Sequence, residues 1–413
     1  MAYEAVGERK RILFLTPQLP YPPQQGTAIR NYNLLAQVAK RHEVHLLSFV
    51  TQTQALSDLG PLRDWCATVQ TVPVPRRSLG SRLWTVLTSP DPDLHHRLSS
   101  QAFHQALTGV LQEVRPQVVE VEGLEMAQYG LHGPHIAVDS PPLWVFDAHN
   151  AEYVLQRRVF ETDARRPRRW IGALYSWLQW HKLRRYEAQV CRRAGTVLAC
   201  SAADAAALAR LVPGLEVVVV PNGVDIAHYQ PDGVVAAELG DRALVFTGKM
   251  DFRPNVDAVL WFCSQVWPLV RQAEPAARFY IVGRDPHPRL GPLGNVPGVT
   301  LTGFVDDIRP YIAAAAVYVV PLLTGGGTRL KVLEAMAMGK PLVSTRLGCE
   351  GIDAQSGRDL ILADAPEDFA AQVLALLKDA PRREALGRAA RAFVERCFDW
   401  PIVTSPLEKV YGR

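Results

Sequence analysis

The feature that most constrains the fold is an alternation between short β-branched runs and longer segments with helical spacing. RILFLT (11–16) and EVHLLSFV (43–50) have the character of strands, and NYNLLAQVAKRH (31–42) between them places apolar residues at helical spacing. Strand–helix alternation predicts parallel sheets with helices on both faces. Right-handed crossovers then bring the carboxyl ends of all strands to one edge, where ligands bind.

The alternation occurs in two sets. The first continues through 117–122, 144–149, 196–201 and 215–223, and the second runs through 243–248, 278–283, 299–303, 317–323 and 341–345. We therefore predict an α/β protein with two Rossmann-like domains. Asn222-Gly223 marks the joint, because Asn-Gly tolerates the positive φ of a turn. The expected divisions are an N-terminal domain at 1–223, a C-terminal domain at 224–395, and a segment at 396–413 that crosses back to the first domain.

Composition excludes several classes of protein. The 413 residues carry a net charge of only +4, which does not by itself imply nucleic acid, and the six cysteines form no CxxC pair. This argues against a zinc ribbon or a disulfide framework and favours reduced thiols in the cytosol. The first ten residues hold both charge signs, unlike a signal peptide, and Pro321 and three glycines interrupt the longest uncharged stretch, 311–328. We expect a soluble cytoplasmic protein, at most attached to a membrane surface.

A glycine loop before a helix is the most informative motif. A strand runs into Gly325, Gly326, Gly327 and Thr328, and a helix is predicted over about 329–338. Exposed amides and the helix dipole favour a phosphate there, and Lys331 adds charge.

Glu334 lies further along the same predicted helix. A carboxylate at this position suits the vicinal hydroxyls of a ribose. The plain alternative is an i,i+3 surface pair between Lys331 and Glu334.

Three segments together resemble a known family. LEAMAMGKPLVST (333–345), PNGVD (221–225) and TGFVDDIRPYIAAAAVYVVP (302–321) are similar to the nucleotide-sugar domain of retaining GT-B glycosyltransferases of family 4 type. GGGTRLKVLEAMAMGKP (325–341) resembles a subgroup of sugar transferases linked to bacterial exopolysaccharide systems. The resemblance implies two Rossmann-like domains, with the donor bound in the C-terminal one, the acceptor in the N-terminal one, and reaction in the cleft. It implies a nucleotide-diphosphate sugar as substrate, with no cofactor and no metal.

The resemblance also assigns donor residues. Glu334 matches the second glutamate of the family's paired motif, which holds the donor ribose. The first glutamate would fall at Gly326, so the contact to the transferred sugar must come from elsewhere, with the amides of Gly326 and Gly327 as candidates. Phe304 and Val305, after Gly303, match the loop that contacts the base.

The segment TGKMDFRPN (247–255) matches the family's glycine-plus-two-cations loop. Gly248 is the glycine, and Lys249 and Arg253 are the cations, although the family usually has arginine first and lysine second. Fixed cations stabilise charge on a departing diphosphate, and one well-placed donor contributes about 3 kcal/mol. The plain alternative is that both are ordinary loop cations.

Candidate residues of the first domain follow its strands. Gly26 matches the family's N-terminal glycine loop, and Thr27 is a neighbouring candidate with a weaker claim. Asn222 lies at the joint about which the domains would close. His149 ends a strand where the family often has a histidine or acid near the reacting sugar, and Asn150 is a possible acceptor contact. A histidine hydrogen-bonded at a strand end is the alternative. Asp91-Pro92-Asp93 (91–93) is interpreted as a turn or helix start, not as a metal site.

The segment 157–193 concentrates the positive charge of the chain. It holds eleven basic and three acidic residues, a net charge of +8, interleaved with tryptophans. Cations beside an indole-rich face are typical of a helix in an anionic membrane interface. The expected contacts are Arg165, Arg166, Arg168, Arg169, Trp170 and Trp177. The alternative is that the tryptophans pack into the first domain. A second, weaker basic aromatic patch lies at 76–87, and no nucleic-acid module is present, so we expect no nucleic-acid partner.

These features predict an enzyme that transfers a sugar, with retention, from a nucleotide-diphosphate donor to a glycan or lipid-linked acceptor in polysaccharide or glycolipid biosynthesis. Two alternatives stay open: a non-catalytic nucleotide-sugar-binding component of a polysaccharide assembly complex, and a nucleotide-sugar epimerase of the same fold.

Overall fold

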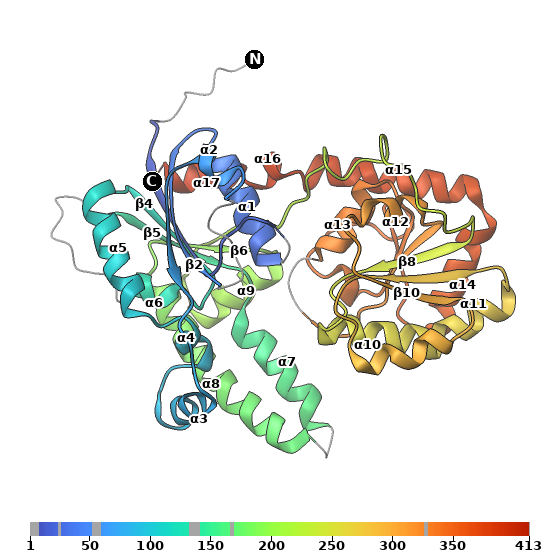
Figure 1. The fold of residues 1–413 in the computed structure, drawn as a ribbon, viewed down its shortest axis with the longest axis horizontal. Coiled ribbons are helices and arrows are strands. Elements are labelled where there is room, and N and C mark those ends of the chain that lie inside the picture. Colours follow the sequence, from blue (N-terminus) through green and yellow to red (C-terminus); the bar gives the residue numbers. More distant parts are fainter. Residues whose placement is uncertain are drawn as a thin grey trace. The chain divides into compact units, whose positions relative to one another are not determined.

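A computed structural model describes residues 8–23, 26–51, 59–131, 141–165, 169–325 and 329–412. The chain forms two compact units (Figure 1). Unit 1 comprises Met1–Pro221 with Thr404–Arg413, and unit 2 comprises Asn222–Val403. Each unit is built around one parallel sheet, as strand–helix alternation predicts, and the α/β fold class is confirmed.

The sheet of unit 1 has seven parallel strands in the order β3-β2-β1-β4-β5-β6-β7. Its strands are β1 (Arg11–Thr16), β2 (Glu43–Val50), β3 (Cys66–Pro73), β4 (Val118–Glu122), β5 (Leu143–Ala148), β6 (Thr196–Ala199) and β7 (Val217–Val219). Strand β4 is buried along its whole length, as are all but the first residues of β1 and β2, because helices cover both faces. Strand β3 was not anticipated, because CATVQTVP exposes half of its residues and lacks a long apolar run.

The helices of unit 1 are α1 (Gly26–Val38), α2 (Leu62–Trp65), α3 (Leu79–Thr88), α4 (Asp93–Arg97), α5 (Gln101–Val114), α6 (Ala127–Leu131), α7 (Glu152–Ala164), α8 (Trp170–Arg193), α9 (Ala202–Leu211) and α17 (Ser405–Tyr411). Helices α7 and α8 pair as a long hairpin that extends away from the sheet (Figure 1). The carboxyl half of α8 returns to the sheet, where Leu183, Tyr186 and Val190 join the core.

The last helix, α17, belongs to unit 1. Its Tyr411 is buried, the hydroxyl donates to the Glu120 carboxylate of β4, and Lys10 donates to the Tyr411 carbonyl. The chain therefore returns to its first unit after completing the second.

The sheet of unit 2 has six parallel strands in the order β10-β9-β8-β11-β12-β13. They are β8 (Ala243–Thr247), β9 (Arg278–Val282), β10 (Val299–Gly303), β11 (Val317–Val320), β12 (Leu342–Ser344) and β13 (Ile361–Leu362). The helices are α10 (Arg253–Trp261), α11 (Trp267–Ala273), α12 (Arg309–Ala314), α13 (Leu330–Ala337), α14 (Pro366–Lys378), α15 (Ala380–Cys397) and α16 (Trp400–Val403), with short η segments at Phe262–Val266, Pro288–Asn295 and Leu347–Cys349. A π-helical segment at Phe262–Val266 joins α10 to α11.

Gly223 serves a different purpose from the one predicted. It does not have positive φ. Instead, a Cβ at this position would lie 2.9 Å from the Phe398 carbonyl oxygen and 2.9 Å from the Trp400 ring. Glycine is therefore required by close packing within unit 2, not by turn geometry.

No helix in the described part of the chain is long and apolar enough to span a bilayer.

Candidate functional site

The strand order of unit 2 creates a switch point between β8 and β11. Connections from neighbouring strands diverge there, so the loops that follow leave a crevice at the carboxyl edge of the sheet. Gly248 and Lys249 follow β8, and Thr324 and Gly325 end the described part of the loop after β11. The predicted donor residues thus come from the two loops that flank this crevice. Gly326, Gly327 and Thr328 lie outside the described residues.

Gly248, Asn255 and Lys331 meet at this edge. Lys331 Nζ donates to Asn255 Oδ1 at 2.8 Å, and the Asn255 amide donates to the Lys249 carbonyl at 2.9 Å. A Cβ on Gly248 would lie 2.7 Å from Asn255 Nδ2 and 2.8 Å from Lys331 Nζ. The absence of a side chain at Gly248 therefore leaves the space that the lysine occupies.

Lys331 is an enclosed cation. Its ammonium also lies 4.1 Å from the centroid of the Phe246 ring. Burial, reinforced by the charge of Arg329 and opposed by that of Glu334, lowers the pKa of Lys331 to about 7. An anion that binds beside this buried ammonium group stabilises the charged form of Lys331.

Glu334 lies one turn further along α13. Tyr229 donates its hydroxyl to Glu334 Oε1 at 3.2 Å. Burial raises the pKa of Glu334, while the Tyr229 hydrogen bond and Lys331 oppose that shift. Arg391 of α15 donates to the carbonyls of Tyr229 and Ala337, which fastens the Tyr229 segment to the end of α13. Glu334 is thus a partly accessible carboxylate with an enclosed cation nearby, and not one half of an exposed helical pair.

The predicted catalytic cations Lys249 and Arg253 are both more exposed than Lys331. Lys249 Nζ lies 2.9 Å from Asp251 Oδ2, and Arg253 Nε lies 3.5 Å from Asp257 Oδ2. Arg253 is the first residue of α10. Each cation therefore has an acid partner within its own segment.

The remaining predicted donor residues also follow strands of this sheet. Phe304 is exposed and Val305 is half-buried, directly after β10. Gly325 has φ +117°, which favours glycine, and the Arg329 guanidinium lies 3.0 Å from where its Cβ would be. Arg329 is itself buried, so a second basic group is enclosed at this loop.

In unit 1, the switch point lies between β1 and β4. Gly26 begins α1 after β1, with Thr27 beside it, and Gly123 follows β4. His149, directly after β5, lies next to this edge, and its Nε2 is 2.9 Å from Glu122 Oε2 at the end of β4. Burial lowers the pKa of His149 and raises that of Glu122. The histidine is therefore hydrogen-bonded at a strand end, and it also lies at the edge where a ligand would bind.

Asn150 and Asn222 are both half-buried. Asn150 Nδ2 donates to Glu152 Oε1 at 3.3 Å, in the turn before α7. Asn222 is half-buried and is the first residue of unit 2.

A buried ion pair supports the His149 strand. Arg30 of α1 donates to both carboxylate oxygens of Asp147, at 2.8 and 3.0 Å, and to the Val220 carbonyl at 3.0 Å. Asp147, Glu122 and His149 are close enough to surround a metal ion. However, Arg30 occupies both oxygens of Asp147 and places a positive charge beside them, so this group fits a cation poorly.

Asp93 has a structural role, as predicted. It begins α4, it is buried, and its carboxylate pairs with Arg77 at 3.0 Å and Arg82 at 3.5 Å. A metal at this position would displace those arginines.

The predicted membrane residues of α8 are exposed. Trp170 is 64% and Trp177 is 44% exposed, so these tryptophans do not pack into the core. Arg165 is exposed, and Arg169 pairs with Asp163 at 3.1 Å. Arg166 and Arg168 lie outside the described residues.

The weaker patch at 76–87 folds as α3, which leaves no residue buried and exposes four large apolar side chains. They are Leu79, Leu83, Trp84 and Leu87.

Sequence reasoning missed several partners in both sites. Asn255, Tyr229 and Glu122 contact predicted residues, but each lies in a different segment from its partner. Gly283 carried a usable signal, because it ends a strand before a polar loop. A Cβ there would overlap the Gly248 carbonyl, so the ends of β8 and β9 approach closely only because residue 283 is glycine.

Comparison with known families decides the assignment. Residues 25–228 match the model described as Glycosyltransferase Family 4, and residues 241–379 match the model described as Glycosyl transferases group 1. The chain belongs to the GT-B glycosyltransferases. The resemblance found in the sequence motifs is confirmed.

Two curated relatives show the extent of the similarity of this GT-B chain to known proteins. It is 28% identical over 211 residues to a D-inositol 3-phosphate glycosyltransferase of Segniliparus rotundus, covering 47% of this chain and 46% of the relative. It is 29% identical over 206 residues to a phosphatidyl-myo-inositol mannosyltransferase of Mycolicibacterium smegmatis, covering 48% and 52%. The chain thus matches about half the length of these relatives.

Solved structures support the fold over nearly the whole chain. Anabaena HepE, in complex with UDP and glucose, aligns with a TM-score of 0.64 at 17% identity, covering 97% of this chain and 99% of that one. Sucrose-phosphate synthase from Thermosynechococcus elongatus aligns with a TM-score of 0.70 at 17% identity, covering 98% of each chain. These similarities establish the GT-B architecture.

Proposed function

We propose that this chain is a retaining glycosyltransferase. It would transfer a sugar from a nucleotide-diphosphate donor to a glycan or lipid-linked acceptor, in polysaccharide or glycolipid biosynthesis. The observation that carries this proposal is that Lys331 lies beside Gly248 at the β8/β11 switch point, with Glu334 one turn further along α13. An enclosed cation beside a glycine turn suits a diphosphate, and a neighbouring carboxylate suits ribose hydroxyls.

Named relatives favour the same chemistry. Two of them are, by name, glycosyltransferases acting on an inositol phosphate and on phosphatidyl-myo-inositol, and the HepE structure contains UDP and glucose. A phosphorylated or lipid-linked acceptor is therefore a reasonable class to test first, together with UDP sugars as donors.

The reaction would use the residues as follows. Lys331, with Lys249 and Arg253, stabilises negative charge on the leaving diphosphate, and Glu334 accepts hydrogen bonds from the ribose. The family resemblance implies front-face attack, in which a departing phosphate oxygen takes the proton of the acceptor hydroxyl. This path needs no carboxylate nucleophile. His149, held by Glu122, is the unit 1 residue proposed to lie near the reacting sugar.

A thermal-shift screen of nucleoside diphosphates and their sugars tests the donor site. One of these ligands should raise the melting temperature of the full chain. Glu334→Ala should abolish this increase in melting temperature. Glu367→Ala, in the first turn of α14, is the matched control and should leave the increase unchanged. The proposal fails if no nucleoside diphosphate binds. NMR of the anomeric proton of the product then distinguishes retention from inversion.

Two results would redirect the assignment. Interconversion of nucleotide sugars without an acceptor would identify an epimerase. Tight binding of a nucleotide sugar, without hydrolysis or transfer to any glycan or lipid-linked acceptor, would favour a binding component of an assembly complex.

We also infer that unit 1 contacts an anionic membrane surface. Ten of the fifteen exposed large apolar side chains in the described residues belong to α3, α7 and α8, which indicates a local apolar face. Arginines near the start of α8 supply the charge that such a surface attracts. Flotation with anionic vesicles should decrease when Arg165, Arg166, Arg168 and Arg169 become Ser, and should be absent with neutral vesicles.

A further inference from the structure

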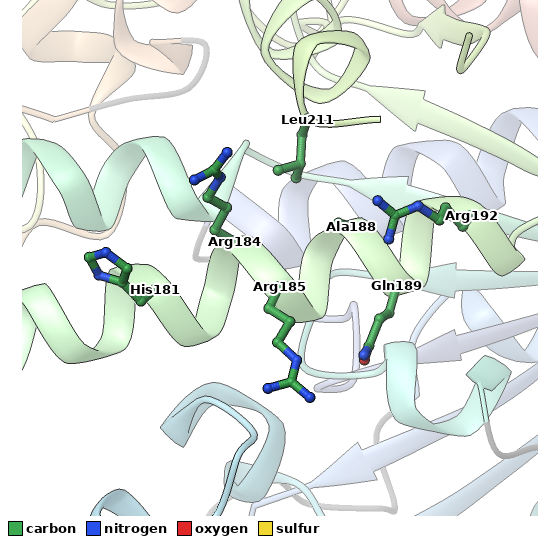
Figure 2. A pocket seen from close by; sticks show the side chains of 7 residues that line it. All are labelled: His181, Arg184, Arg185, Ala188, Gln189, Arg192 and Leu211. Atoms are coloured by element: carbon green, nitrogen blue, oxygen red, sulfur yellow. The ribbon is translucent and has the colours of Figure 1, made fainter. Parts of the chain in front are cut away.

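The carboxyl half of α8 carries a basic groove that the donor site does not use. A hollow of about 470 Å³ is lined by Arg184, Arg185 and Arg192, together with His181, Gln189 and Leu211. Figure 2 shows Arg184 and Arg192 on either side of Leu211, which approaches from α9, while Arg185 and Gln189 extend from the other side of the helix. We call this hollow the α8 arginine groove.

A second hollow continues the basic lining. Its volume is about 290 Å³, it shares Arg184 and Leu211 with the groove, and it adds Arg157 and Arg210. The residues that line these two hollows include no aspartate or glutamate.

The arginines of the groove are not neutralised by the protein. Among the described residues, no carboxylate lies within 4.0 Å of Arg184, Arg185, Arg192 or Arg210. By contrast, Arg157 pairs with Glu161 at 2.7 Å. Like charges gathered around one hollow repel one another, and an anionic ligand removes that repulsion.

Part of the groove lining, His181, Arg184 and Arg192, lies on the same face of α8 as the exposed aromatic residues. Trp170, Leu174 and Trp177 precede His181, Arg184, Ala188 and Arg192 at intervals of three or four residues, and all of these except the buried Ala188 are exposed. Such spacing keeps side chains on one side of a helix, here over a length of about 33 Å at 1.5 Å per residue. The His181 ring lies 4.6 Å from the Trp177 ring, so the aromatic and basic halves meet directly.

This continuity indicates the occupant. A helix face whose first half exposes tryptophan and leucine and whose second half exposes unpaired arginines suits the boundary between acyl chains and phosphates. A soluble polyanion, such as a nucleic acid, would explain the arginines but not the exposed apolar half.

We propose that the α8 arginine groove binds the phosphate groups of anionic lipid headgroups, next to the part of α8 that inserts its aromatic residues into the interface. The proposal rests on the membrane contact inferred for unit 1 and specifies which residues recognise the headgroup. Arginine is suited to this role because its planar guanidinium donates two parallel hydrogen bonds to a phosphate.

Vesicle flotation of the full chain tests the proposal. The triple variant Arg184→Gln, Arg185→Gln, Arg192→Gln should bind anionic vesicles about a hundredfold more weakly, from a loss of about 1 kcal/mol for each charge. A matched variant with Arg382, Arg388 and Arg396 of α15 changed to Gln removes the same charge from unit 2 and should change binding far less. Circular dichroism and thermal melting verify that both variants fold.

Lipid composition separates a headgroup site from general attraction. At equal surface charge, wild type should prefer phosphatidic acid to phosphatidylglycerol, because a phosphomonoester offers more oxygens to the arginines, and the triple variant should lose that preference. Unchanged flotation of the triple variant would refute headgroup binding by the α8 arginine groove, but it would not contradict the membrane contact of unit 1.

Failure of the membrane contact itself has a different signature. In that case the wild-type protein does not float with any of the vesicles, whatever their lipid composition. A triple variant that keeps vesicle binding but loses binding to heparin or duplex DNA would assign the groove to a soluble polyanion and reject the lipid proposal.

Discussion

Binding of a nucleotide sugar should be coupled to protonation of Lys331. Burial lowers the pKa of Lys331 to about 7, so near neutral pH only about half of the free protein carries the charged ammonium. A diphosphate beside Nζ favours the charged form and raises that pKa. The complex therefore holds one proton more than the free protein above neutral pH.

The size of the effect follows from the pKa. At pH 9 only about 1% of the free protein has a charged Lys331, against about 50% at pH 7. If the bound lysine stays charged, affinity falls about fiftyfold over this range, equivalent to about 2.3 kcal/mol. Below about pH 6 the affinity should level off, because Lys331 is already protonated. A nucleotide sugar is the better ligand for this test than a free nucleoside diphosphate, whose terminal phosphate titrates near pH 6–7.

Isothermal titration calorimetry in buffers of different ionisation enthalpy measures the proton directly. At pH 8, wild type should take up most of a proton on binding, and Lys331→Met should take up none and bind weakly at every pH. Lys340→Met is the matched control, because burial also lowers the pKa of Lys340 but its Nζ donates to the Ala313 carbonyl instead. Identical heats in all buffers, with an affinity independent of pH, would refute the reasoning.

The same lysine should reduce the stability of the free protein. Because the folded pKa lies below the unfolded value, the unfolded chain binds the proton more strongly between about pH 7 and pH 10.5. The free energy of unfolding therefore rises with pH across this window. Below about pH 7 the full destabilisation caused by burying the charged Lys331 is present. Lys331→Met should raise the free energy of unfolding near pH 7 by up to about 4 kcal/mol, measured by denaturant titration.

Three further substitutions test other contacts. Gly248→Ala should weaken nucleotide binding at least tenfold with little change in fold, measured by calorimetry, because the new methyl group would take the space of Lys331 Nζ. Glu334→Gln should weaken binding of a nucleoside diphosphate about tenfold but leave pyrophosphate binding unchanged, since only the ribose contact loses its charge. Arg30→Met should lower the free energy of unfolding by about 3–5 kcal/mol, because it strands the buried Asp147 carboxylate, and Asp147→Asn in the same chain should recover part of that loss.

Local patterns were sufficient for the architecture. The run at 243–248 becomes β8, which is buried throughout, because an uninterrupted apolar run is typical of a central strand of a parallel sheet. The run at 278–283 becomes β9, in which Phe279, Ile281 and Val282 are buried. The helix α13 begins one residue after the predicted start. Its ends could be placed from the sequence because glycines precede it and Gly339 follows it, and glycine is a local signal for the end of a helix. Strand β3 was missed because its alternation is half exposed and contains no long apolar run.

The hydrogen-bond partners of the predicted site residues could not be predicted from the sequence, because they come from distant segments of the chain. Lys331 and Glu334 were predicted as neighbours on a helix, yet their hydrogen-bond partners are Asn255 and Tyr229, which approach from elsewhere in unit 2. Arg30 follows the predicted glycine loop, but the fold commits it to Asp147 in the core. No local pattern carries this information, because a side chain's environment is set by packing between elements.

By itself the sequence determined which segments are strands and helices, where parallel topology gathers their ends, and which family the chain belongs to, because periodicity and motif spacing are local properties. Only the tertiary structure decided that Lys331 is enclosed while Lys249 and Arg253 stay in contact with solvent. It also decided that α8 exposes Trp170 and Trp177. The physical reason is that the pKa of a side chain depends on its desolvation and on neighbouring charged groups, and both are established only when residues distant in the sequence pack together.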